Sequence, residues 1–244
     1  MPVPREDPVT FCPDDLVEEL RRAIAGAGDP ERAPQMQAYM KSSMPFRGVS
    51  AQPLARLCRV VMDAHRVPDR ETWHRVVLML WDGAEYREER YAALALTGHR
   101  YYRGYQDPSL LPLYRHLVVT GAWWDYVDQV AAHRVGPILR GAPGTVTPLM
   151  RQWALDDHLW VRRTALLCQL SARAATDTDL LGFVLERNLE DSPYGMEFFI
   201  RKAVGWALRE YAKTDEDWVV DFVERHHDRL SGLSRREALK NVRR

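Results

Sequence analysis

The chain has 244 residues, of which 46% are hydrophobic, and its 34 basic and 34 acidic residues leave a formal net charge of zero at pH 7. Because the charges balance, no global field draws the chain to nucleic acid or to a membrane surface, and any polyanion site must be a local patch. The 3 cysteines are widely spaced, so the sequence predicts neither a disulfide framework nor a CxxC zinc site. No apolar run approaches the roughly 18 residues that a membrane span needs.

Helical periodicity runs through almost the whole chain. Residues 1–13 contain four prolines and are predicted to form a flexible tail. The segments after it carry apolar residues at helical spacing and are separated by Pro, Gly and Asp clusters, and no run alternates as a strand does. The predicted helices are Asp14–Ala25, Gln52–His65, Arg70–Trp81, Arg87–Gly98, Asp107–Thr120, Trp123–His133, Thr147–Ala154, His158–Ala172, Thr176–Leu189, Glu197–Lys213, Glu216–His226 and Arg235–Val242.

Many short helices joined by short turns are typical of stacked helix pairs. We therefore predict an all-α fold, a HEAT-like helical-repeat superhelix that forms a single domain over residues 14–244. A compact helical bundle is the alternative, because the repeats show no visible self-similarity in sequence.

The segment Gly121–Asp128 is the first that carries chemistry. Trp124 and Asp128 are four residues apart, so on a helix the indole stands beside the carboxylate. An aromatic wall next to an anion suits a flat cationic ligand, or a cation that forms during a reaction. The alternative is a core tryptophan pair, with Asp125 as a cap or facing solvent.

Arg163 is an unusual residue in an apolar stripe. The predicted helix His158–Ala172, with Asp156 and Asp157 as expected caps, is apolar nearly all round. An unpaired buried guanidinium is costly, so Arg163 must meet a carboxylate or open into a cleft. Its partner is expected to be Asp128 or Asp125, either to fix a working carboxylate or as a purely structural ion pair.

Trp206 lies on the helix Glu197–Lys213, opposite its apolar stripe. On this arc it is joined by the cations Lys202, Arg209 and Lys213. An aromatic residue among cations is typical of a nucleic-acid surface. Alternatively, Trp206 covers a seam between repeats and the charges are solvated.

Two further clusters are basic. In the first, a helix end runs into a loop that carries Tyr39, Lys41 and Arg47, which suit contacts with phosphates and a DNA groove. The second is a capped helix start that carries Arg235 and Arg236, a setting that favours phosphate. An ordinary helix–loop junction and a solvated surface helix are the respective alternatives.

Several common catalytic motifs are missing from the sequence. It contains no phosphate-binding loop of the GxxxxGKS or GxxxxGKT type, no HExxH, no GxSxG and no Cys/His metal spacing. We therefore expect neither a metal nor a cofactor.

Taken in order, these segments resemble the DNA alkylation repair family, and within it the AlkD-type alkylpurine DNA glycosylases. The resemblance extends over roughly residues 30–240. The matching segments are Tyr39-Met40-Lys41 with Phe46-x-Gly48, Leu80-Trp81-Asp82, Trp123-Trp124-Asp125-x-Val127-Asp128, Trp160-Val161-x-Arg163, Glu197–Lys213 and Leu233–Ala238.

The resemblance implies a concave, basic face that holds duplex DNA, and hydrolytic release of N3- and N7-alkylated purines. The residues at the family's active-site positions are Trp124, Asp128, Arg163 and Trp206, and Tyr39 matches its groove-contacting tyrosine. Because the sequence contains no long apolar run, we expect a cytoplasmic protein without a membrane partner, and we further expect a bacterial monomer that acts at the nucleoid. Two features depart from the family pattern: a longer turn over residues 188–196, and a chain that ends soon after Arg236.

The chemistry agrees with these residues. An alkylated purine is cationic and already a good leaving group, so the remaining need is to stabilise an oxocarbenium-like sugar and to position a water. Asp128 is expected to do both, Arg163 to orient it or to grip a phosphate, and Trp124 and Trp206 to flank the sugar. Trp123 and Asp125 are then structural. The alternatives are a non-catalytic scaffold that binds DNA or protein, and a resistance glycosylase for bulky adducts.

Overall fold

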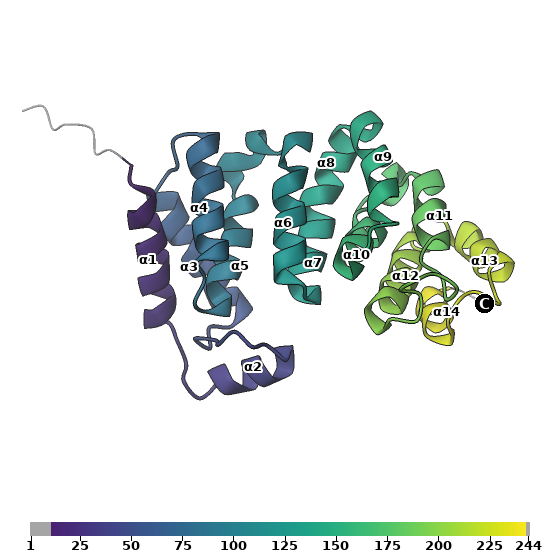
Figure 1. The fold of residues 1–244 in the computed structure, drawn as a ribbon, viewed down its shortest axis with the longest axis horizontal. Helices are drawn as coiled ribbons and strands as arrows, with labels where there is room; N and C mark the ends of the chain where they lie inside the picture. The colour runs from purple at the N-terminus through teal and green to yellow at the C-terminus, as the bar shows by residue number, and fades with distance from the viewer. Residues whose placement is uncertain (1–10, 243–244) are drawn as a thin grey trace, which may run out of the picture. The chain divides into compact units, whose positions relative to one another are not determined.

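The structure is a computed structural model that describes residues 11–242, and this part of the chain consists of helices without strands (Figure 1). The prediction of an all-α fold is confirmed. The chain divides into two compact units, one ending at Tyr105 and the other beginning at Gln106. The HEAT type of the repeats and a single domain over residues 14–244 stay predictions. Most of the predicted tail lies outside the described residues, and Pro13 already belongs to the first helix.

In the N-terminal unit, four helices pack side by side around two buried tryptophans, Trp73 and Trp81. A fifth, short helix lies across one end of them (Figure 1). These helices are α1 (Pro13–Gly26), α3 (Ala51–Ala64), α4 (Arg70–Asp82), α5 (Arg87–Thr97) and the short α2 (Ala33–Met40), and a 3-10 segment, Arg100–Tyr105, follows.

The short helix α2 was not among the segments predicted from helical periodicity, although a helix end was expected just before the loop that carries Lys41 and Arg47. Met40 is its one buried residue, so its sequence has no apolar stripe from which helical periodicity can be read. The longer helices of this unit were predicted because each buries a full stripe. Helix α4, for example, begins where Asp69 accepts a hydrogen bond of 2.8 Å from the backbone N–H of Thr72.

In the C-terminal unit, α10 is the central helix. It packs against α6, α7, α9, α11 and α12, and α12 packs most closely against α14. The elements are α6 (Leu111–Gly121), α7 (Trp124–Val130), a π-helical turn (Ala131–Val135), α8 (Gly136–Gly141), α9 (Pro143–Trp153), α10 (Leu159–Leu167), α11 (Thr178–Glu186), α12 (Phe198–Tyr211), α13 (Glu216–Arg225) and α14 (Gly232–Ala238), with 3-10 turns at Pro108–Leu110 and Arg173–Ala175.

Several predicted helix ends in this unit were wrong. Helix α9 begins at Pro143 rather than Thr147, because a proline is tolerated in the first turn, where its missing N–H has no helical partner. The N-cap of α10 is His158 and not an aspartate. Asp156 instead accepts a 2.9 Å hydrogen bond from the backbone N–H of His158, the residue that precedes the first helical residue, Leu159.

Candidate active site and nucleic-acid interface

Asp128 of α7 and Arg163 of α10 form a bidentate ion pair. Arg163 donates from Nε to Asp128 Oδ1 and from Nη2 to Oδ2, both at 2.8 Å. Its third nitrogen, Nη1, donates to the backbone carbonyl of Phe199 at the start of α12. The side chains are only 5% (Arg163) and 15% (Asp128) exposed. Of the two carboxylates that the sequence offered to Arg163, the fold therefore brings Asp128 into this pair.

The environment of Asp128 contains opposing electrostatic effects. Burial raises the pKa of Asp128 above the usual value for an aspartate, while the hydrogen bonds and positive charge of Arg163 act to lower it. The nearby carboxylate of Asp125 adds to the rise. Arg163 is thus the group that favours the ionised form of Asp128, and the pair holds that carboxylate in a fixed orientation in a water-poor setting.

An aromatic cluster adjoins this ion pair. The rings of Trp123 and Trp160 lie 6.0 Å apart, and Phe199 lies 5.3 Å from Trp123 and 4.9 Å from Trp160. Because these residues come from the start of α7, from α10 and from α12, the cluster fastens the three helices together. The ring of Trp123 is half-buried in this cluster, and its structural role stays a prediction. Phe199 was not singled out in the sequence, because its contribution to Arg163 is made through the backbone.

Trp124 and Trp206 stand on the helices that meet at the ion pair. Trp124 is the first residue of α7, one turn before Asp128, and Trp206 lies seven residues after Phe199 on α12. Both side chains are half-buried, so each retains surface accessible to a ligand. Since α10 packs against both α7 and α12, the four predicted active-site residues lie on three adjoining helices of one unit.

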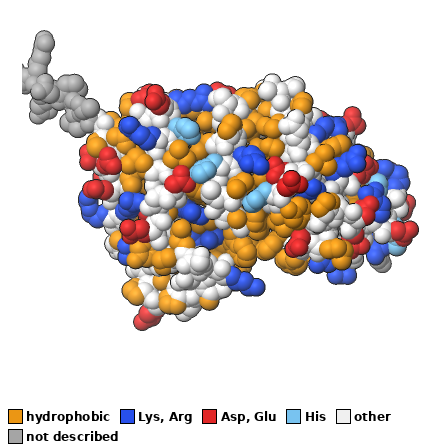
Figure 2. Space-filling view, in the orientation of Figure 1, with side chains coloured by type: hydrophobic (Ala, Val, Ile, Leu, Met, Phe, Trp, Pro, Cys, Tyr) orange, Lys and Arg blue, Asp and Glu red, His pale blue; other side chains and the backbone are white. Residues whose placement is uncertain are grey.

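The predicted cations of α12 are all paired with carboxylates. Lys202 Nζ lies 3.2 Å from Glu237 Oε1, and Arg209 Nη1 donates to Glu237 Oε2. Lys213 Nζ donates to Glu210 at 2.6 Å. Figure 2 shows cationic and anionic side chains interspersed over α11–α14 rather than gathered by sign. The sequence did not predict the role of Glu237, because α14 and α12 are distant in sequence and come into contact only in the tertiary structure.

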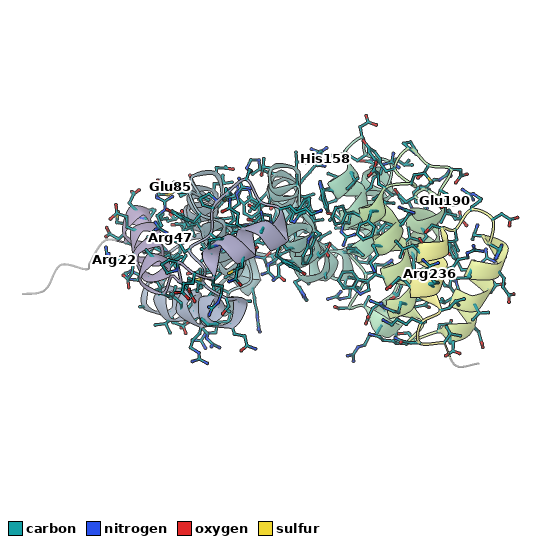
Figure 3. The ribbon with its side chains drawn as sticks, turned by 90° about the horizontal axis from the view of Figure 1, so that it is seen from below. Arg22, Arg47, Glu85, His158, Glu190 and Arg236 are labelled. Carbon is teal, nitrogen blue, oxygen red and sulfur yellow. The ribbon has the colours of Figure 1, made fainter. Side chains whose placement is uncertain are left out.

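The two arginines of α14 do not stand at its start, as the sequence had suggested. Ser231 caps the helix by accepting a 2.9 Å hydrogen bond from the backbone N–H of Ser234, so the helix begins at Gly232. Arg235 and Arg236 therefore lie in its last turn. Arg235 contacts His227, whereas Arg236 is exposed and is labelled on α14 in Figure 3.

The predicted groove-contacting residues belong to the N-terminal unit. Tyr39, near the end of α2, is 76% exposed, and Lys41 follows it in a left-handed conformation with φ of 48°. The guanidinium of Arg47, also labelled in Figure 3, lies over the ring of Tyr86, 3.5 Å from its centroid. The side chain of Tyr39 is thus exposed to solvent, and Arg47 is ordered by a cation–π contact. Their contacts with a DNA groove stay predictions.

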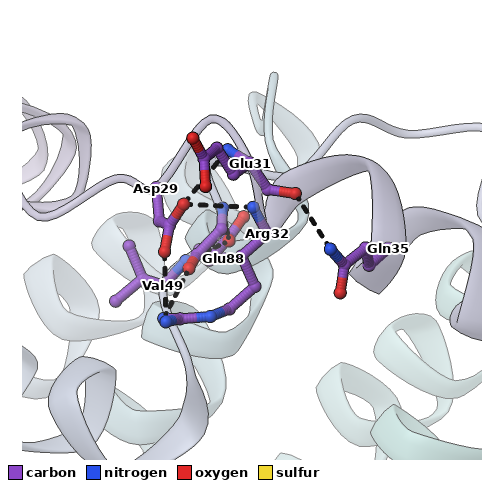
Figure 4. Close-up of polar contacts among 7 residues, drawn as sticks. Asp29, Glu31, Arg32, Gln35, Val49 and Glu88 are labelled. Atoms are coloured by element: carbon purple, nitrogen blue, oxygen red, sulfur yellow. Dashed lines mark hydrogen bonds and ion pairs between the residues drawn. The ribbon is translucent and has the colours of Figure 1, made fainter.

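The loop after α2 is held by a buried carboxylate, Glu88 of α5. Glu88 is wholly buried and accepts hydrogen bonds from the backbone N–H groups of Arg47 at 3.0 Å, Gly48 at 2.9 Å and Val49 at 3.1 Å. The same loop contacts the segment just before α2, where Asp29 N–H donates to the carbonyl of Arg47 at 2.8 Å. Figure 4 shows Glu88 and Val49 together with this segment, in which the Asp29 carboxylate accepts from the backbone N–H groups of Glu31 and Arg32. The sequence did not predict the role of Glu88, because about 40 residues separate it from the loop and no local pattern indicates their contact.

Two further observations concern metal and thiol chemistry. Among residues 11–242 no group of three His, Cys, Asp or Glu side chains is placed to hold a metal ion. Burial raises the pKa of the thiols of Cys58 and Cys168 to about 12, so neither is a thiolate at neutral pH. Over the same stretch no helix is long and apolar enough to cross a membrane.

The chain is similar to known proteins both in sequence and in fold. The sequence matches the family model of the DNA alkylation repair enzymes over residues 20–242. The fold is similar to a solved structure, a predicted DNA alkylation repair enzyme from Enterococcus faecalis, with a TM-score of 0.77 and 28% sequence identity over 88% of this chain and 96% of that chain. A search of curated proteins found no significant match. Because the family model spans nearly the whole chain, the chain belongs to the DNA alkylation repair enzyme family.

Proposed function

We propose that the protein is a monofunctional DNA glycosylase that hydrolyses the N-glycosidic bond of N3- and N7-alkylated purines in duplex DNA. It would act as a cytoplasmic monomer without metal or cofactor. The observation that carries this proposal is the bidentate ion pair of Arg163 and Asp128, in a chain of the DNA alkylation repair family. A carboxylate held in one orientation and shielded from water stabilises a cation that develops beside it, because it need not reorganise during the reaction.

The reaction places its main demand on the sugar. Alkylation at N3 or N7 makes the purine cationic, so it leaves as a neutral base with the electron pair of the C1′–N bond. Positive charge then develops on the deoxyribose, and a water must attack C1′ and lose a proton. Each oxygen of Asp128 accepts one hydrogen bond from Arg163, which leaves lone pairs for that water and a negative charge for the sugar.

Arg163 is best suited to an orienting role. All three of its nitrogens donate to protein acceptors, and the side chain is 5% exposed. Although two of its five N–H groups remain, a guanidinium this deeply buried offers little surface to a DNA phosphate. Of the two roles proposed for it, orientation of Asp128 is therefore favoured. Trp124 and Trp206 are proposed to flank the sugar with their π-faces.

The test is release of 7-methylguanine and 3-methyladenine from methylated duplex DNA. The wild type is expected to release at least one of them, and Asp128→Asn to lose about 10²–10³-fold in rate. Asp179→Asn is a matched control, because Asp179 is exposed on α11 and away from the ion pair. If the wild type releases neither base, or if Asp128→Asn equals the wild type, the catalytic assignment fails.

One observation favours a second candidate, a non-catalytic DNA-binding scaffold. The ion pair of Asp128 and Arg163 is nearly closed to solvent, as a purely structural pair would be. A scaffold would bind duplex DNA, release no base, and respond to Asp128→Asn by losing stability alone. The same assay on DNA that carries bulky purine adducts tests the resistance-glycosylase variant, which predicts release of the bulky base in preference to the methylated ones.

A further inference from the structure

Helices α12 and α14 are in tight contact at Gly205. A Cβ atom at this position would lie 2.6 Å from Glu237 Cβ and 3.0 Å from the carbonyl oxygen of Ser234, so a larger residue has no room there. Ser234 Oγ also donates to the carbonyl of Arg201 at 2.9 Å. The absence of a side chain at Gly205 therefore lets α14 hold the stem of Glu237 directly over the middle of α12.

Glu237 is placed between two cations. Lys202 and Arg209 are seven residues apart on α12, about two turns, and Gly205 lies between them. One carboxylate oxygen contacts Lys202 Nζ at 3.2 Å, and the other accepts from Arg209 Nη1. The side chains are 38% (Lys202), 25% (Arg209) and 19% (Glu237) exposed, so all three stay within reach of solvent or of a ligand.

The carboxylate of Glu237 is ionised at neutral pH. Partial burial by itself raises its pKa, but the hydrogen bond and charge of Lys202, with the charges of Arg209 and Lys240, outweigh it and lower the pKa below the usual value. The Glu237 carboxylate offers Lys202 and Arg209 two negatively charged acceptor oxygens, as a DNA phosphate does. The carboxylate and a phosphate cannot both occupy the position that faces these two donors.

We propose that Glu237 competes with DNA phosphates for Lys202 and Arg209, and thereby lowers the affinity for undamaged duplex DNA. This inference rests on the DNA-binding part of the proposed function. Phosphate contacts supply nearly all of the affinity for undamaged sequence. A repair enzyme must leave undamaged DNA quickly, so an internal anion that weakens two such contacts shortens the time spent away from lesions.

The test uses the full chain and an unmodified, fluorescently labelled duplex, with affinity measured by anisotropy over a series of salt concentrations. Glu237→Gln keeps the size of the side chain and removes its charge. It is expected to bind about three- to tenfold more tightly at 0.1 M salt, with a log–log salt slope steeper by about one to two, because two cations become free for phosphates. Circular dichroism and thermal melting verify that each variant is folded.

Two matched variants isolate the cause. Glu224→Gln on α13 changes the net charge equally at an exposed site that does not touch these cations, and it is expected to tighten binding by less than twofold, since distant surface charges are screened. Glu237→Asp keeps the charge and is expected to stay near the wild type. In a Lys202→Gln/Arg209→Gln background, the effect of Glu237→Gln should vanish.

The outcomes separate this inference from the proposed activity. Weaker or unchanged binding by Glu237→Gln would overturn it, because the carboxylate would then only position the cations. Equal tightening by Glu224→Gln would overturn it as well, since net charge alone would explain the gain. A wild type that binds duplex DNA but releases no alkylated base defeats the glycosylase proposal and leaves the competition testable. A chain that does not bind DNA defeats both.

Discussion

Arg163 joins Asp128 to the carbonyl of Phe199, so that one guanidinium links α10 to α7 on one side and to α12 on the other. The same contact orients the proposed working carboxylate and fastens the helices that carry Trp124 and Trp206. Function and stability are therefore coupled at this residue, and a variant of Arg163 must be tested for both.

Replacement of Arg163 should shift the pH dependence of base release. Burial already raises the pKa of Asp128, and Arg163 opposes this rise. Arg163→Gln removes the opposing effect, so the pKa rises further and the proton binds at higher pH. Because the ionised carboxylate is the active form, activity falls as the pH drops through this pKa, and the acid limb of the variant should lie at higher pH than that of the wild type. Single-turnover rates between pH 4 and about 8 test this, and coincident acid limbs would contradict it.

Substitution of Trp124 or Trp206, the two tryptophans proposed to flank the sugar, should affect the rate of base release more than substitution of Trp123. Trp124→Ala and Trp206→Ala each remove a π-face from the sugar site and are expected to lower the single-turnover rate by about tenfold, a cation–π contribution of about 1–2 kcal/mol. Trp123→Phe instead disturbs the aromatic cluster with Trp160 and Phe199. It should lower the melting temperature and change the rate of base release by less than twofold. A loss of rate at Trp123 equal to that at Trp124 would rule out this division of roles.

Gly48 should be intolerant of any side chain. Its φ is +88°, and a Cβ atom there would lie 2.1 Å from the carbonyl oxygen of Asp29, a rigid backbone atom. Gly48→Ala is expected to destabilise the protein by about 1–3 kcal/mol or more. Gly104→Ala is the control, because nothing lies within 4 Å of its Cβ position. Urea unfolding of both variants measures the difference, and equal midpoints would show that the loop adapts.

Neutralising Glu88 should loosen the loop that it holds. Three backbone N–H groups converge on this buried carboxylate. Glu88→Gln weakens charge-assisted hydrogen bonds and points an amide N–H at these donors, at an expected cost of about 2 kcal/mol. Amide hydrogen exchange at Arg47, Gly48 and Val49 should accelerate.

Glu85→Gln is the control for Glu88, because Glu85 is exposed just before α5 and is labelled in Figure 3. Unchanged protection of the three amides in Glu88→Gln would mean that the loop is held by other contacts.

Much of the fold could be predicted from the sequence because helical periodicity is a local property. Residues three and four apart share a face, so a buried stripe shows itself within one segment, as in α4 and α12. The prediction failed where the stripe is missing or interrupted. Helix α2 buries only Met40, and the helix predicted over Trp123–His133 stops within the π-helical turn, so α8 was missed.

The sequence by itself determined the members of the candidate site that lie within one helix: Trp124 beside Asp128, Arg163 in an apolar stripe, and Trp206 among cations. Only the tertiary structure decided their partners. It paired Arg163 with Asp128 rather than Asp125. It also placed Glu237 in contact with Lys202 and Arg209, and it brought the backbone N–H of Gly48 to the carboxylate of Glu88. The reason is physical: ion pairs and buried hydrogen bonds act over a few ångströms, and the packing of distant helices decides which charges come that close.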